Sequence, residues 1–271
     1  MLEITDNEFK KLTEYIKINY GINLSHKKTL IVGRLQNYLV QKGFKTFSQY
    51  FDNIISDKTG NEVTVLINKL TTNHTFFMRE AAHFEYYRNK VLPYLQATEA
   101  KRRDLRIWSA GCSSGEEPYT LAMMNLDFFG SEKTLWDTKI LATDISTNVL
   151  ESAVKGTYPT ESIEALPKNW KLSYFNRQNE ETSVISDKVK SEVIFRRLNL
   201  MESAFPFKNK FHVIFCRNVM IYFEPKTKNE LINKFYELTV DGGYLFIGHS
   251  ESINREEAKY KYIMPAVYRK E

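Results

Sequence analysis

The chain has 271 residues, of which 42% are hydrophobic and 26% charged, with a net charge of +5 and a pI near 8.9, as in an ordinary globular protein. No apolar run approaches the roughly 20 residues that a membrane helix needs, and the opening MLEITDNEFK lacks the basic and apolar regions of a signal peptide. The two cysteines stand outside any metal-binding spacing, so we expect a cytoplasmic protein with no membrane insertion, metal site or disulfide framework.

The spacing of apolar residues predicts a small all-helical domain over residues 1–92. Thr5 and Glu8 form a capping-box pair at the start of a first helix, and a glycine at position 21 ends it. A second helix is expected over residues 27–41, and two shorter helices follow before residue 71. The apolar faces of these helices would hold the domain together.

This domain contains a long segment without any acidic residue, between Glu14 and Asp52. Lys27, Lys28 and Arg34 lie within it and would share a basic helix face. Such a face suits nucleic acid, an anionic membrane or an acidic protein partner. The alternative is a solvated face with no partner.

The sequence TTNHTFFMRE, at residues 71–80, places polar side chains among aromatic ones. One residue such as Asn73 or Thr75 would be enough to cap the following helix. Several of them, together with Arg79, favour a site. A polar linker is expected over residues 93–103, before the second domain.

The sequence LRIWSAGCSSGEEPY, at residues 105–119, predicts a buried strand, a glycine turn and a helix. In an α/β sheet such a turn lies at the carboxyl edge, where ligands bind. A phosphate would favour the helix N-terminus, but Glu116 and Glu117 stand there and would repel it. They suit a ligand with cationic and hydroxyl groups, such as S-adenosylmethionine. The alternative is that both acids only complement the helix dipole.

Asp144 follows a second predicted strand at residues 139–143. An acid at this place in a nucleotide-binding sheet hydrogen-bonds ribose hydroxyls. Asp144 would equally serve as the N-cap of the next helix. The spacing leaves both interpretations open.

The remaining segments complete an α/β sheet over residues 104–271. An inserted antiparallel β-subdomain is expected at about residues 170–197. The sequence FHVIFCRNVMIYF, at residues 211–223, predicts a further buried strand. Two pairs of residues follow the carboxyl ends of strands, on the edge where ligands bind: Asn199 and Leu200, and Asn218 and Val219.

Residues 111–115 also satisfy G-x-S-x-G, the nucleophile elbow of α/β-hydrolases. Ser113, Asp144 and His249 follow the order of a hydrolase triad. However, no stretch that would supply an oxyanion hole precedes them, and the acid comes one strand too early. The adjacent glutamates would oppose an oxyanion, so the sequence disfavours a hydrolase.

Taken together, five stretches closely resemble the chemotaxis receptor methyltransferases of the CheR family: TTNHTFFMRE, IWSAGCSSGEEPYTLAM, LATDIS, NLM and FCRNVMIYF. The resemblance implies a Rossmann-like, S-adenosylmethionine-dependent methyltransferase sheet with an N-terminal all-helical domain and an inserted β-subdomain. It implies transfer of a methyl group to receptor glutamates, with S-adenosylhomocysteine as the second product. The cofactor contacts that it implies are Asn73, Thr75, Arg79, Glu117, Asp144, Asn199, Leu200, Asn218 and Val219.

The chemistry of the reaction agrees with this resemblance. A glutamate acceptor is ionised at neutral pH, since its reference pKa is about 4.3, and it needs no base or covalent nucleophile. Alignment of the two reactants supplies much of the rate. Arg79 would orient the acceptor carboxylate through a bidentate contact, and Tyr222 would help to place it. The acid-free segment with Lys27, Lys28 and Arg34 is predicted to dock the glutamate-bearing helices of a receptor.

Two features limit the choice of partner. Family members that tether to a receptor's C-terminal peptide have a glycine-rich loop in the β-subdomain, whereas the turn here is NRQNEET, so we expect no tether peptide. No basic stretch with interleaved aromatic residues favours nucleic acid. The alternatives are a sensor that only binds S-adenosylmethionine and a methyltransferase acting on nucleic acid.

Overall fold

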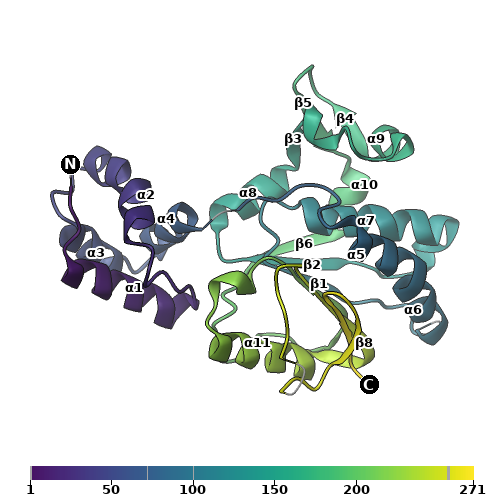
Figure 1. The fold of residues 1–271 in the computed structure, drawn as a ribbon. Helices are drawn as coiled ribbons and strands as arrows, with labels where there is room; N and C mark the ends of the chain where they lie inside the picture. The colour runs from purple at the N-terminus through teal and green to yellow at the C-terminus, as the bar shows by residue number, and fades with distance from the viewer. Residues whose placement is uncertain (1, 72, 100, 255–256) are drawn as a thin grey trace.

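The computed structural model describes residues 2–71, 73–99, 101–254 and 257–271. Figure 1 shows a group of helices at the N-terminal end of the chain, set beside a larger α/β domain. The predicted fold class, an α/β sheet with an N-terminal helical domain and an inserted antiparallel subdomain, is confirmed.

The helical domain begins with the predicted capping box. The Thr5 hydroxyl accepts the Glu8 N–H, and the Glu8 carboxylate accepts the Thr5 N–H at 2.9 Å. Gly21, at φ +71°, ends this helix in the left-handed region that a residue without Cβ adopts most easily. The buried faces form one apolar core around Ile16 and Leu35. The helices are α1 (Asp6–Tyr20), α2 (Lys28–Gln41), α3 (Phe47–Ser56) and α4 (Asn61–Leu70).

The helical domain ends earlier than the predicted boundary at residue 92. Its apolar core comes from residues 4–70, whereas Phe77, Phe84 and Leu92 belong to the core beside the sheet. The predicted linker at residues 93–103 is largely helical, because apolar positions at helical spacing continue to Leu95 and pack against the sheet. These elements are α5 (Ala81–Tyr86), η1 (Tyr87–Val91) and α6 (Leu92–Thr98).

The main sheet has seven strands in the order β6-β2-β1-β7-β8-β10-β9. The first five run parallel, and β10 pairs antiparallel with both β8 and β9. Near the C-terminus the chain turns at Ala266, at φ +62°, between the last two strands. The strands are β1 (Ile107–Ala110), β2 (Ile140–Asp144), β6 (Val193–Arg197), β7 (Phe211–Cys216), β8 (Thr239–Ile247), β9 (Lys261–Met264) and β10 (Val267–Arg269).

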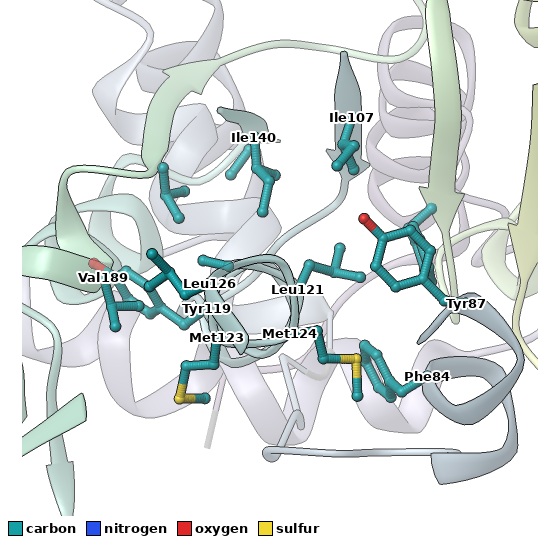
Figure 2. Packing of buried hydrophobic residues seen from close by; sticks show 14 of the residues in the cluster. Phe84, Tyr87, Ile107, Tyr119, Leu121, Met123, Met124, Leu126, Ile140 and Val189 are labelled. Atoms are coloured by element: carbon teal, nitrogen blue, oxygen red, sulfur yellow. The ribbon is translucent and has the colours of Figure 1, made fainter. Parts of the chain in front are cut away.

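Helices cover both faces of this sheet, because successive side chains of a strand point to opposite faces. Ile107 packs on the side of α5, α6 and α7 (Glu116–Phe129), whereas Trp108 packs on the side of α11 (Pro225–Leu238). Figure 2 shows the first of these layers, with Leu121 of α7 between the strands and the aromatic rings of α5 and η1. The buried sheet therefore leaves its carboxyl edge as the place for a ligand.

The inserted β-subdomain is a three-stranded antiparallel sheet in the order β3-β5-β4. It starts before the predicted residue 170, and residues 193–197 pair with β2 in the main sheet instead. Trp170 and Tyr174 lie on a helix, where both donate hydrogen bonds to Asp127 of α7. Its elements are β3 (Thr157–Pro159), η3 (Thr160–Ile163), α9 (Lys168–Tyr174), β4 (Phe175–Arg177), β5 (Thr182–Ile185) and α10 (Asp187–Lys190).

Three further elements join the strands of the main sheet: η2 (Gly130–Leu135), α8 (Thr147–Lys155) and η4 (Met220–Tyr222). Among the described residues, none of the helices combines the length and the apolar character that a membrane crossing requires.

Candidate active site

A cavity of about 390 Å³ lies between the helical domain and the carboxyl edge of the parallel strands. This volume is in the range of small-molecule sites. The cavity is lined by all nine residues predicted to bind the cofactor and by Tyr222. Lys27, Lys28 and Arg34 do not line it. The lining segments are residues 20, 22, 67–68, 71, 73–76, 79, 84, 111–113, 117, 144–146, 198–200, 217–219 and 221–223.

The glycine turn after β1 forms the floor of the site. Gly111 has φ +84°, and a Cβ at this position would collide with the side chain of Val219 in the loop after β7. The N–H groups of Gly111 and Cys112 both donate to the Thr143 carbonyl, at 2.8 and 2.9 Å. The two loops therefore approach each other at a distance that only glycine permits.

The two glutamates at the start of α7 point in different directions. Glu117 lines the cavity and accepts hydrogen bonds from the Ser109 hydroxyl at 2.7 Å and from Arg217 Nη1 at 3.0 Å. Glu116 is buried outside the cavity lining, where it accepts the Ser114 hydroxyl at 2.7 Å. Burial raises the pKa of Glu116. The expectation that both carboxylates face the ligand is therefore wrong for Glu116.

Asp144 stands at the carboxyl end of β2 and lines the cavity. Its carboxylate accepts the N–H of Ser113 at 2.9 Å and that of Ser146 at 3.0 Å. Ser146 is the N-cap of α8, because its hydroxyl accepts the Val149 N–H at 3.2 Å. This contradicts the alternative that Asp144 caps the helix. Burial raises the pKa of Asp144.

Arg217 forms a buried ion-pair network that the sequence did not predict. Its guanidinium, with the side chain 2% exposed, lies 3.0 Å from Glu80 and 3.0 Å from Glu117. It also donates to the Arg79 carbonyl. Burial alone would raise the pKa of Glu80, but the charge and hydrogen bond of Arg217 hold it below its ordinary value. The network ties the TTNHTFFMRE segment to the strand ends of β1 and β7.

The loop after β7 is held in place by Glu251. Its buried carboxylate accepts the N–H groups of Asn218 at 3.0 Å, Ile221 at 3.1 Å and Gly248 at 2.6 Å. Asn218 takes a left-handed conformation, at φ +59°. Its side-chain amide donates to Glu80 at 3.2 Å. These bonds orient Asn218 and the neighbouring Val219 at the cavity wall.

Arg79 and Tyr222, the two predicted acceptor-orienting residues, line the same cavity from different loops. The half-buried guanidinium of Arg79 donates to the His74 carbonyl at 2.6 Å. Tyr222 lies at the end of η4, and its carbonyl accepts the Asn23 N–H from the helical domain at 2.9 Å. The cavity thus has an arginine and a phenol that an anionic acceptor can reach.

Among the described residues, Glu80, His83 and His249 place potential metal-ligand atoms within 4.8 Å of one another. Both oxygens of Glu80 already accept hydrogen bonds, from Arg217, Asn218 and the His249 N–H. A cation at this position would compete with the guanidinium for the same carboxylate. The geometry therefore favours the ion pair.

The predicted docking residues of the helical domain have different surroundings. Lys27 is exposed, and Lys28 pairs with Asp6 at 2.6 Å. The Arg34 guanidinium donates to the carbonyls of Leu70 at 2.9 Å and Thr71 at 3.1 Å, at the end of α4. Arg34 therefore has a structural task as a helix cap.

The hydrolase alternative has no support from the geometry. The Ser113 hydroxyl donates to the Asn73 carbonyl at 3.0 Å, and its N–H donates to Asp144. The His249 ring lies against the His83 ring, with the ring centres 4.4 Å apart. The three residues do not form the hydrogen-bonded relay of a triad.

The cavity fits S-adenosylmethionine in its chemistry. The carboxylates of Glu117 and Asp144 can accept hydrogen bonds from ammonium and hydroxyl groups, and Arg79 can pair with a carboxylate. A phosphate-bearing nucleotide would instead meet Glu117 at the start of α7.

Comparison with known proteins agrees with this reading of the site. Residues 73–268 match the family described as "CheR methyltransferase, SAM binding domain", and residues 7–71 match "CheR methyltransferase, all-alpha domain". A chemotaxis protein methyltransferase of Borreliella burgdorferi is 46% identical over 99% of this chain and 96% of its own length. The chemotaxis protein methyltransferase of Escherichia coli is 36% identical over 98% of this chain and 92% of its own. A probable chemotaxis protein methyltransferase of Rhizobium etli is 38% identical, with 87% and 89% covered.

Proposed function

The chain belongs to the CheR family of S-adenosylmethionine-dependent methyltransferases, and we propose that it methylates glutamate side chains in the cytoplasmic helices of chemotaxis receptors. The products are glutamate methyl esters and S-adenosylhomocysteine. The observation that supports this best is the cavity, because the nine residues predicted to bind the cofactor, Arg79 among them, and Tyr222 all line one space. The enzyme would work in the cytoplasm, where these receptor helices lie.

In this proposal the carboxylates of the cavity hold the cofactor. Asp144, oriented by two backbone N–H groups, binds the ribose hydroxyls. Glu117, oriented by Ser109 and Arg217, faces the ammonium group. Val219 and the backbone of the loop after β1 enclose the adenine. Each binding group is fixed by its own hydrogen bonds before the cofactor arrives, which reduces the entropy lost on binding.

S-adenosylmethionine supplies an electrophilic methyl group, and the protein supplies orientation. An acceptor glutamate is already a carboxylate at neutral pH, so a carboxylate oxygen forms the new bond without proton transfer. Arg79 pairs with this carboxylate, and the Tyr222 hydroxyl donates to it. Holding the carboxylate in line accounts for most of the rate enhancement that these residues need to provide.

The helical domain docks the acceptor helix through its acid-free segment. Lys27 is exposed, and Lys28 forms a surface ion pair with Asp6, so both can meet receptor glutamates. Arg34 is engaged with the end of α4, and we therefore place the docking contact on the two lysines. The turn between β4 and β5 has no glycine, and we propose that no receptor tether peptide binds there and that nucleic acid is not a substrate.

The test uses methyl-labelled S-adenosylmethionine and a receptor cytoplasmic fragment that carries glutamates. Carboxyl methyl esters release methanol in mild base, so the label should be base-labile. Arg79→Ala should lower turnover by about 100-fold through lost alignment. Arg88→Ala, an exposed arginine outside the cavity, is the matched control and should keep full turnover.

The alternatives give different results in the same assay. A protein that only senses S-adenosylmethionine would bind the cofactor in calorimetry and transfer no label. A nucleic-acid methyltransferase would place base-stable label on RNA or DNA. Either outcome would refute the proposal.

A further inference from the structure

We infer that residues 19–24, the end of α1 and the first part of its connection to α2, position two loops of the cofactor site from the helical domain. These residues are called the connecting segment below. One loop is residues 199–201, and the other is residues 222–224. The inference rests on the proposed function and deepens it, because it makes the helical domain a working part of the methyltransferase site as well as a docking surface.

The connecting segment holds the loop at residues 222–224 through its backbone and one side chain. Ile22 pairs with Phe223 as an antiparallel bridge, and the Asn23 N–H donates to the Tyr222 carbonyl at 2.9 Å. The Asn23 amide also donates to Glu224 at 3.0 Å. Tyr222, the proposed acceptor-orienting residue, is therefore fixed from the helical domain.

The same segment holds the loop at residues 199–201. The Asn199 amide donates to the Asn19 carbonyl at 2.8 Å, while its oxygen accepts the Met201 N–H at 3.0 Å. The side chain of Asn199 thus bridges the two domains at one end and shapes its own loop at the other. Any contact of Asn199 and Leu200 with the cofactor depends on this anchor.

Gly21 lies at the point where both loops meet the connecting segment. It is buried at φ +71°, and a Cβ there would lie 2.6 Å from Met201 Sδ and 3.1 Å from the Phe223 ring. The neighbours Tyr20 and Ile22 line the cavity itself. A single added methyl group would therefore meet the flexible side chain of Met201 and the aromatic ring of Phe223 at once, next to the ligand.

Gly43 offers a matched control for this glycine. It also follows a helix of the helical domain at positive φ, +81°, but a Cβ there would meet nothing within 4 Å. Gly21→Ala and Gly43→Ala thus share the backbone strain of alanine in a left-handed conformation. Only Gly21→Ala also places its methyl group against the side chains of the two loops.

The first experiment measures S-adenosylhomocysteine binding by calorimetry, without any receptor. Gly21→Ala should weaken binding by about 10-fold or more, because displaced loops no longer match the ligand, whereas Gly43→Ala should stay within about 2-fold of wild type. Equal affinities for two folded variants would overturn the inference. This measurement decides the positioning role even if the receptor proves not to be the substrate.

A second pair of variants covers the case in which Gly21→Ala does not fold. Asn23→Asp keeps the oxygen that accepts from Ser25 but puts a carboxylate against Glu224. It should lower kcat by about 10-fold and change the S-adenosylhomocysteine Kd by less than about 3-fold, because Tyr222 stands on the disturbed loop. Adding Glu224→Gln reverses donor and acceptor and should restore turnover. An unchanged kcat in Asn23→Asp, or no rescue, would contradict the positioning role.

Discussion

Replacing Arg217 by methionine should destabilise the protein strongly. The guanidinium is buried between Glu80 and Glu117, at 3.0 Å from each, and the two glutamate side chains are only 14% and 13% exposed. Methionine preserves much of the volume but leaves two carboxylates close together without a counter-charge. One of them must then take up a proton or draw in water.

The structure sets the size of this effect. Removing one partner of a buried ion pair costs about 3–5 kcal/mol, because the remaining charge stays desolvated. The pair Lys259–Glu237 is the contrast, since its side chains are 61% and 67% exposed. Lys259→Met should cost less than about 1 kcal/mol. Arg217→Met/Glu80→Gln should recover part of the loss, because it removes one of the two carboxylates.

Urea unfolding at pH 7 would measure the three variants against wild type. S-adenosylhomocysteine binding should weaken in Arg217→Met, because Glu117 loses one of the two groups that orient it. If Arg217→Met were as stable as Lys259→Met, or if Glu80→Gln brought no recovery, the network would not have the role that its burial indicates.

Two further predictions follow from charged groups elsewhere. Burial, with Arg217 nearby, lowers the pKa of His83 from 6.5 to about 4, so the unfolded chain takes up a proton that the folded one does not. The free energy of unfolding should therefore fall by about 2 kcal/mol through His83 between pH 7.5 and pH 5. His83→Asn should lack this part of the pH dependence. If chemical denaturation gave the same pH dependence for His83→Asn and wild type, this prediction would be refuted. Lys27→Glu/Lys28→Glu should raise the KM for the receptor about 10-fold at low salt, less at high salt, with cofactor affinity unchanged; an unchanged KM would exclude the two lysines from docking.

The parts of the fold that the sequence predicted well are those with local signals. The capping box of Thr5 and Glu8, the glycine end of α1 and the strand–turn–helix around Gly111 need only neighbours in the chain. The domain boundary was placed too late, because periodicity identifies helices but not the core they join. The predicted β-subdomain at about residues 170–197 begins instead with part of the helix α9, since Trp170 and Tyr174 suit helical spacing as well as alternation.

The candidate site likewise combines features that local sequence predicts with features that depend on residues far apart in the chain. The motifs that carry the family resemblance identified the lining residues, but no sequence pattern pairs Arg217 with Glu80, 137 positions away. Glu116 and Glu117 are neighbouring residues of the same type. Their different directions on α7 bury the carboxylate of Glu116 and place that of Glu117 at the cavity. The connecting segment joins residues about 200 positions away through the backbone N–H of Asn23 and through the side-chain amides of Asn23 and Asn199, and no local sequence pattern indicates these pairings.

The position of the connecting segment would link the proposed docking to catalysis. Lys27 and Lys28 lie at the start of α2, directly after the segment whose Gly21 and Asn23 lie against the two loops. A receptor helix bound at these lysines would act on the same short stretch that contacts Tyr222. Because coupling between two binding sites is reciprocal, any factor by which a bound receptor strengthened cofactor binding would equal the factor by which the cofactor strengthened receptor docking. The proposed docking face and the cavity would then be coupled through the interface between the domains.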